Sequence, residues 1–198
     1  MNNIHFIDPS NAEQNNYFLN DVYRLRNDTF KTRLGWEVSS ENGLEKDGFD
    51  KLDVCHIAMT DQKDHVVGCW RALPTQGPYM LRNVFPQLLR GEYCPDQSDI
   101  WEISRFTVDK EFGANTNKLV SDSTARLVKS FYDFAKHKGI KSYVLVTTVA
   151  CERILRCLGV KTRRMGDGKS MQVGIERSVA LWLYVDESLN IPLIDKAA

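Results

Sequence analysis

The sequence has no apolar run that approaches the roughly 18 residues needed to cross a membrane. Its first residues, "MNNIHFIDPSNAEQNN", also lack the basic stretch and following apolar stretch of a secretory signal. Because both features are missing, we expect a cytoplasmic protein without a membrane partner.

Cysteine is sparse and shows no pairing pattern. The five cysteines have neither CxxC pairs nor zinc-finger spacing: Cys55, Cys69, Cys94, Cys151 and Cys157. This predicts reduced thiols and no metal site. The 198 residues also lack repeats, low-complexity segments and an internal linker, so we expect residues 1–198 to form a single domain.

Net charge is also absent, since 26 basic residues balance 26 acidic ones. The halves differ, however: residues 1–98 hold 10 basic and 14 acidic residues, and residues 99–198 hold 16 and 12. This asymmetry favours a basic surface that meets an acidic partner, although scattered solvated charges explain it equally well. Without a net positive charge or a recognition motif, we expect no nucleic-acid partner.

The hydrophobic pattern predicts alternating strands and helices. Helical periodicity occurs at residues 17–34, 118–139 and 151–159, with a further short helix at 84–89, whereas strand-like runs occupy 54–60, 66–73, 100–108, 142–149 and 171–185. The first two runs flank a polar turn and predict a hairpin. Residues 36–52 form an acidic loop of unusual length. The order predicts an α/β domain with a mixed sheet.

One predicted strand, "IWEISRFTV" at residues 100–108, carries two charges among core-type residues. On an ideal strand Glu102 and Arg105 point to opposite faces. Either the strand lies at a wet edge, or a bulge turns both side chains toward one cleft. Arg71 in "GCWRAL" repeats the anomaly, which favours a charged cleft between neighbouring strands.

Other charged and aromatic residues have two explanations each. Asp47 and Asp50 flank the "GF" of "EKDGFD" and fit either a surface turn or a charged site. Arg26 and Phe30 lie four residues apart on a helix, just before Trp36, and fit either packing or an aromatic site.

Taken together, the motifs "RLRNDTFKTRLGW", "EKDGFD", "GCWRALPTQGPYMLRNVFPQLL", "WEISRF" and "VTTVACERIL" closely resemble those of the acyl-homoserine-lactone synthases, the autoinducer synthases of bacterial quorum sensing. Nine positions match the pattern that recurs in this family: Arg26, Phe30, Trp36, Asp47, Asp50, Arg71, Phe85, Glu102 and Arg105. The resemblance implies a fold like the GNAT acetyltransferases, with a mixed sheet splayed into a cleft and flanking helices.

The resemblance also implies an activity. S-adenosylmethionine (SAM) and an acyl chain on acyl carrier protein would be the substrates, with no further cofactor. We expect Glu102, as the base, to act with Asp47 and Arg105 in catalysis. The expected SAM-binding residues are Arg26, Phe30, Trp36, Asp47, Asp50, Arg71, Ser104, Arg105 and Phe106. The aromatic rings suit the sulfonium, but the sequence does not separate the roles of the arginines.

Two further regions follow from the same resemblance. Phe85, Leu145 and Thr147 would line the acyl pocket, and Thr147 favours a 3-oxo chain. The segment "ERILRCLGVKTRR" provides a basic cluster for docking the acidic carrier protein. Its members are Arg153, Arg156, Lys161, Arg163 and Arg164.

Two other functions compete with this one. Residues 163–168, "RRMGDG", match the R-x-x-G-x-G pyrophosphate loop of GNAT acyltransferases that use acyl-CoA. Such a loop should open a helix, whereas here a strand pattern follows, so we expect a hairpin turn. A ligand-binding domain without catalysis is the second alternative, which the set of carboxylates and arginines disfavours.

Overall fold

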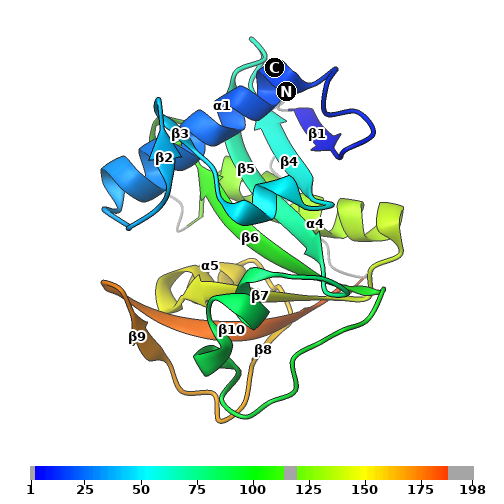
Figure 1. Ribbon diagram of the computed structural model, residues 1–198, viewed down its shortest axis with the longest axis vertical. Coiled ribbons are helices and arrows are strands. Elements are labelled where there is room, and N and C mark those ends of the chain that lie inside the picture. The colour runs from blue at the N-terminus through cyan, green and yellow to red at the C-terminus, as the bar shows by residue number, and fades with distance from the viewer. Residues whose placement is uncertain (1–2, 114–119, 187–198) are drawn as a thin grey trace.

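A mixed sheet forms the centre of the computed structural model, which describes residues 3–113 and 120–186 (Figure 1). Within these residues the strand order is β1-β4-β5-β6-β7-β10-β8, and β9 also pairs with β10. The strands are β1 (Asn3–Ile7), β4 (Cys55–Thr60), β5 (Val66–Pro74), β6 (Ile100–Val108), β7 (Ser142–Thr148), β8 (Thr162–Arg164), β9 (Met171–Val173) and β10 (Glu176–Tyr184). A separate two-stranded ladder joins β2 (Ser40–Glu41) to β3 (Leu44–Glu45).

Helices cover both faces of the sheet. The α-helices are α1 (Asn16–Arg26), α2 (Met80–Asn83), α3 (Lys110–Gly113), α4 (Asp122–Lys138) and α5 (Val149–Cys157). Two 3₁₀ turns, η2 (Gly48–Lys51) and η3 (Pro86–Leu89), and a π-helical segment, η1 (Asn27–Arg33), complete the set. None of the described helices is long and apolar enough to cross a membrane.

The predicted helices are found with altered ends. The helix expected at 17–34 is α1, whose last part widens into the π-helix η1. The helix expected at 118–139 is α4, which Ser121 caps and Gly139 ends with a φ of +71°. Residues 118 and 119 lie outside the described part of the chain.

The sheet opens at its centre, as the resemblance implied. β6 and β7 pair in parallel only where Ile100–Ile103 lie beside Ser142–Leu145. Beyond Ile103, β6 continues along β5, while β7 follows β10, so the two central strands separate (Figure 1).

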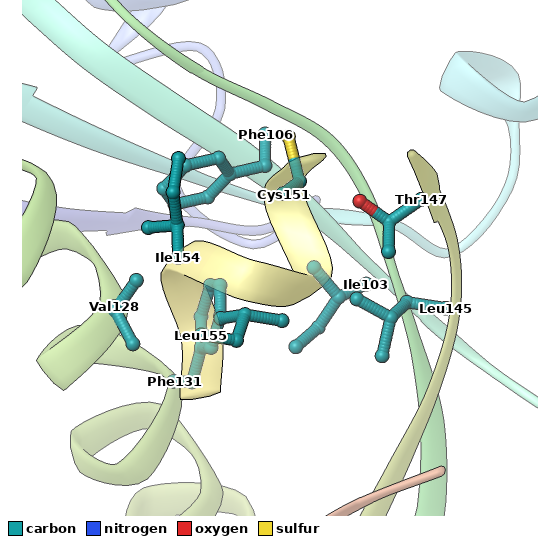
Figure 2. Close-up of a pocket in the computed structure, with 9 residues that line it drawn as sticks. All are labelled: Ile103, Phe106, Val128, Phe131, Leu145, Thr147, Cys151, Ile154 and Leu155. Carbon is teal, nitrogen blue, oxygen red and sulfur yellow. The ribbon is translucent and has the colours of Figure 1, made fainter. Parts of the chain in front are cut away.

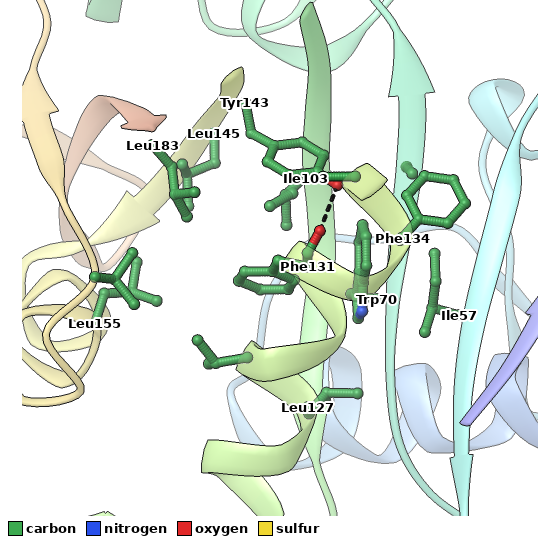
Figure 3. Close-up of a cluster of buried hydrophobic side chains, with 14 of the residues drawn as sticks. Ile57, Trp70, Ile103, Leu127, Phe131, Phe134, Tyr143, Leu145, Leu155 and Leu183 are labelled. Atoms are coloured by element: carbon green, nitrogen blue, oxygen red, sulfur yellow. Dashed lines mark hydrogen bonds between the residues drawn. The ribbon is translucent and has the colours of Figure 1, made fainter. Parts of the chain in front are cut away.

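The main core fills the space between the sheet and α4. Trp70 is fully buried, contacts the edges of Phe131 and Phe134, and donates a hydrogen bond to Ser130 Oγ over 2.9 Å. The Tyr143 hydroxyl donates to the carbonyl of Phe131, which ties β7 to the same helix (Figure 3). Clusters on the opposite face pack α1 and α2 against the sheet.

Two predictions about the sheet were incomplete or wrong. The edge strand β1, which pairs with β4, was not foreseen. Residues 163–168 do not form a hairpin turn, because β8 and β9 both pair with β10 and not with each other. Met165 still bonds the carbonyl of Ala180, and a turn closed by the Gly168 N–H and the Met165 carbonyl starts the interruption between the two strands. The tight turn instead lies at Gly174, whose φ is +58°.

Candidate active site

A bulge in β6 answers the question of the two charges. Arg71 lies opposite Ser104, and the register between β5 and β6 shifts beyond this pair. Arg105 takes a φ of +55°, a left-handed conformation that is rare for a residue with a side chain. The shift brings the Arg105 guanidinium to the face that holds Glu102 and Arg71, so the bulge hypothesis is confirmed. The wet-edge explanation is wrong, since β6 is a central strand and Glu102 is 1% exposed.

The predicted arginines and aspartates form one connected network. Arg26 binds Asp50 with two parallel hydrogen bonds of 2.8 Å. Arg71 Nη1 reaches Asp50 over 2.8 Å and Asp47 over 2.6 Å, and Arg105 Nη2 reaches Asp47 over 2.8 Å. Burial alone would raise the pKa of Asp50, but the hydrogen bonds and charge of Arg26 hold it well below its usual range.

Glu45 completes this network and was not foreseen. It is fully buried in β3, accepts a hydrogen bond from Arg26 Nε, and lies 3.1 Å from Arg105 Nη2. Three carboxylates thus face three guanidinium groups. The only signal in the sequence was its place in an acidic loop, which does not distinguish it from its neighbours.

The turn η2 holds the two aspartates in place. Asp47 Oδ1 accepts from the backbone N–H of Phe49, and Asp50 Oδ2 accepts from the backbone N–H of Asp47. This reciprocal capping follows from their i, i+3 spacing. Both explanations of "DGFD" therefore hold, since the segment is a turn and presents its carboxylates to the arginines.

Glu102 lies beside the network without an ion pair among the described residues. Its carboxylate accepts hydrogen bonds from the backbone N–H groups of Met80, over 2.9 Å, and Leu81, over 2.7 Å. Complete burial raises the pKa of Glu102 to about 7, against the opposing effect of these two bonds and of the nearby arginines. This carboxyl group can therefore exchange a proton near neutral pH.

The predicted aromatic pair, Phe30 and Trp36, lies beside Arg105 of the charged network. Phe30 and Trp36 stack with ring centroids 5.1 Å apart, and the Arg105 guanidinium lies 5.6 Å from the Phe30 centroid. Phe30 belongs to the π-helix η1, where Thr29 also bonds Thr107 of β6 over 2.8 Å. The widened turn thereby anchors the aromatic pair to the central strand.

An apolar pocket lies on the other side of β6, against α5 (Figure 2). Its lining residues come from β6, α4, β7 and α5: Ile103, Phe106, Val128, Phe131, Leu145, Thr147, Cys151, Ile154 and Leu155. Leu145 and Thr147, which were expected to line an acyl pocket, both line this apolar pocket, and Thr147 contributes a hydroxyl group to its wall (Figure 2).

The side chains of two further aromatic residues have other neighbours. Phe106, expected among the SAM-binding residues, directs its ring to the opposite face and packs on Phe131, 5.7 Å between centroids, so its binding role stays a prediction. Phe85, expected to line the acyl pocket, is not among the residues that line this apolar pocket, and its role stays a prediction too. It packs against the cluster of Leu81 and Leu88, because the chain after β5 crosses to that face of the sheet.

The predicted basic cluster is largely paired with acids. Arg156 and Arg164 both bind Glu152, which is 2% exposed, and Lys161 pairs with Asp186. Arg163 binds Glu92 over 2.6 Å. Within the described part of the chain, Arg153 on α5 is the exposed member without an ion pair.

Glu92 also binds residues 163–168, the segment that resembles a pyrophosphate loop. Its carboxylate accepts from the backbone N–H of Gly166, over 2.6 Å, and from Trp182 Nε1, over 2.7 Å. The hydrogen bonds and charge of Arg163, with those of Gly166 and Trp182, lower the pKa of Glu92 to about 2 against a smaller effect of burial. A loop amide that already binds a carboxylate, and that opens no helix, is poorly suited to a pyrophosphate.

Comparison with known proteins places this arrangement in a family. The family model described as autoinducer synthase matches residues 10–190. An acyl-homoserine-lactone synthase of Aeromonas salmonicida is 38% identical over 168 residues, which cover 85% of this chain and 81% of that protein. One from Aliivibrio fischeri is 39% identical over 169 residues, covering 85% and 87%.

Solved structures agree with the sequence relatives. The acyl-homoserine-lactone synthase LasI superposes with a TM-score of 0.84 at 33% identity, over 98% of this chain and 95% of LasI. The N-acyl amino acid synthase FeeM, from uncultured soil microbes, shares the fold at 14% identity, with a TM-score of 0.63 over 94% of this chain and 92% of FeeM. The fold is GNAT-like, and the chain belongs to the autoinducer synthase family. It is an acyltransferase of the acyl-homoserine-lactone synthase type, which makes signals for quorum sensing.

Proposed function

We propose that this enzyme transfers an acyl chain from acyl carrier protein to the amine of SAM and then closes the lactone ring. The observation that carries this proposal is the position of Glu102 and Ile103 on β6, at the point where β6 and β7 separate. Glu102 faces the charged network, and the adjacent Ile103 lines the apolar pocket. A polar and an apolar substrate can therefore meet across one strand.

Ligands named for structural neighbours support this assignment. The synthase BjaI, with a TM-score of 0.86 at 24% identity, is described with SAM and isopentyl-CoA, and also with MTA. TofI is described with an inhibitor and MTA. We interpret MTA as methylthioadenosine, the product expected when SAM loses its aminobutyryl group.

The first step is acyl transfer. Ionised Glu102 takes a proton from the SAM ammonium, directly or through a water, and the free amine attacks the thioester carbon. Each Glu102 oxygen accepts one backbone hydrogen bond and retains a second lone pair for this proton. The tetrahedral intermediate collapses as the carbon–sulfur bond of the thioester breaks, and the nitrogen releases its second proton to the departing thiolate, so that the carrier leaves as a thiol. A backbone N–H at the β6 bulge is a candidate donor to the oxyanion of the intermediate.

The second step is ring closure. A carboxylate oxygen of the acylated SAM attacks the carbon that carries the sulfonium on its side chain. The carbon–sulfur bond breaks, the electron pair stays on sulfur, and neutral methylthioadenosine leaves. Asp47 and Asp50 would hold the ammonium beforehand, and Trp36 with Phe30 would contact the sulfonium, each worth about 1 kcal/mol when desolvated. Arg26, Arg71 and Arg105 align these carboxylates through charge-assisted hydrogen bonds.

The pocket on the other face would take the acyl chain, and the hydroxyl of Thr147 suits a 3-oxo group. We expect Thr147→Val to lower kcat/KM for a 3-oxoacyl donor about fivefold while changing that for the unsubstituted acyl donor less, because a lost hydrogen bond is worth about 1 kcal/mol. Competition between the two donors, read as a product ratio by mass spectrometry, measures this preference. An equal loss for both donors would mean that Thr147 only shapes the pocket.

The donor is proposed to be a carrier protein because Glu92 occupies the loop amide of Gly166 that a coenzyme A pyrophosphate would need. Some structural neighbours are nonetheless described as CoA-dependent. The purified enzyme should release methylthioadenosine and an acyl-homoserine lactone from SAM and acyl carrier protein loaded with chains of several lengths. If products form only with acyl-CoA, the acyl donor is coenzyme A and not the carrier protein. Binding of SAM without either product would favour the ligand-binding alternative.

A further inference from the structure

The thioether of Met80 lies between two arginines of the candidate site. Met80 Sδ is 3.2 Å from Arg71 Nη2 and 3.3 Å from Arg105 Nη1. The site is enclosed, since Met80 is 9% exposed and Arg71 is fully buried. Two cationic N–H groups therefore converge on one neutral sulfur atom.

These N–H groups are the ones without a strong acceptor. Arg71 directs Nε to Ser104 and Nη1 to the two aspartates, while Arg105 directs Nε and Nη2 to Glu45 and Asp47. A thioether accepts hydrogen bonds only weakly. A carboxylate in its place would gain two charge-assisted hydrogen bonds, so this corner is built for an anionic group.

The corner lies next to the base that the proposed mechanism uses. The backbone N–H of Met80 binds Glu102 Oε2, while the side chain of the same residue fills the corner between the arginines. An α-amino acid carries its ammonium and carboxylate groups on one carbon. Its ammonium can therefore approach Glu102 while its carboxylate enters the corner.

We propose that Met80 is a positioning residue whose thioether holds this corner in the free enzyme and moves out when the carboxylate of the substrate binds. Methionine suits this role because its unbranched side chain has three rotatable bonds. The inference rests on the proposed function, in which the amino-acid group is that of SAM.

Calorimetric binding of three ligands tests the proposal. SAM and S-adenosylhomocysteine carry the carboxylate, whereas methylthioadenosine lacks the whole amino-acid group. We expect Met80→Leu and Met80→Ala to bind the first two about three- to tenfold more tightly, because no hydrogen-bonded thioether has to leave the corner, with methylthioadenosine unchanged. Leucine keeps most of the side-chain volume, so the Leu variant remains informative if the Ala variant is unstable.

Met165→Leu is the matched control, because Met165 is 2% exposed and the arginine contacts with a thioether described above involve Met80 instead. It should change none of the three affinities. If the Met80 variants bind all three ligands with one common change, or bind SAM more weakly, Met80 merely packs beneath the ligand and the inference fails. Lactone formation by the unmodified enzyme distinguishes failure of this inference from failure of the proposed function. If the enzyme makes the lactone, only the role proposed for Met80 is contradicted. An enzyme that binds none of the ligands overturns the proposed function as well.

Discussion

Glu102 is a buried acid whose pKa of about 7 sets an expectation for the pH dependence. Because the base must be ionised, kcat/KM should rise as the pH increases through about 7 and level off above it. Glu102→Gln should lower kcat about 100-fold or more and remove this rise, since general base catalysis contributes at least that much. Single-turnover rates across pH, beside SAM affinity from calorimetry, measure both effects.

The exposed Glu111 provides a control, and Glu111→Gln should leave rate and pH profile unchanged. If Glu102→Gln weakens SAM binding as much as it slows turnover, Glu102 binds substrate rather than acting as the base.

Glu45 tests how far stability depends on the charged network. Glu45→Gln should lower the free energy of unfolding by about 3 kcal/mol, because removing one member of a buried ionic network leaves Arg26 and Arg105 undercompensated. Urea denaturation measures this loss. Asp133→Asn, which breaks the exposed pair with Lys129, should cost about 0.5 kcal/mol or less. Similar losses in both variants would show that the network adds little.

At the residue scale, the sequence pointed to those site residues whose charge is unusual in an otherwise apolar strand. Glu102 and Arg71 could be recognised because each interrupts a run of core residues. Glu45 could not, since it lies in an acidic loop and its burial depends on arginines 19 and 60 residues away. The pairing of Arg163 with Glu92 joins residues 71 apart and is equally invisible in a local pattern.

Among the elements, the segment of residues 166–170 between β8 and β9 allows a specific prediction. Gly166 has a φ of +55°, and an added Cβ would lie 2.4 Å from Arg90 Cβ and 2.6 Å from its carbonyl oxygen. Gly166→Ala should therefore destabilise the fold by about 3 kcal/mol, combining backbone strain with overpacking. Thermal and urea unfolding measure the loss.

Gly174 is the matched control for that substitution. It has a similar φ of +58°, but nothing lies within 4 Å of an added Cβ. Gly174→Ala should cost only about 1 kcal/mol, from the backbone conformation alone. If the two variants unfold alike, the contact between this segment and Arg90 is not tightly packed.

Element types followed from periodicity, but their irregularities did not. The hairpin of β4 and β5 and the helix α4 match their patterns, because two largely apolar runs around a polar turn favour buried strands and helical spacing reports on burial. The π-helix η1, the bulge at Arg105 and the interruption between β8 and β9 arise from tertiary contacts. These three irregular features shape the site and its surroundings.

At the scale of the whole molecule, surface charge should guide the carrier protein that we propose as the acyl donor. Arg153→Glu should raise KM for acyl carrier protein about fivefold at low salt with little change in KM for SAM, because a reversed surface charge repels an acidic partner. Steady-state kinetics at two ionic strengths measure it, and the difference should shrink at high salt. Lys136→Glu makes the same charge change on α4 and should have no effect. Equal effects would mean that only the overall charge matters.

The short pairing between β6 and β7 also bears on how the chain folds. In the described residues, this stretch from Ile100–Ile103 to Ser142–Leu145 is the only strand pairing between two otherwise antiparallel halves of the sheet. It joins segments some forty residues apart, so α4 must form and dock before the halves register. Closing long-range contacts of this kind is slow. We therefore expect the rate-limiting barrier to lie at this pairing, with the buried Trp70 and Tyr143 among the residues already ordered when it is crossed.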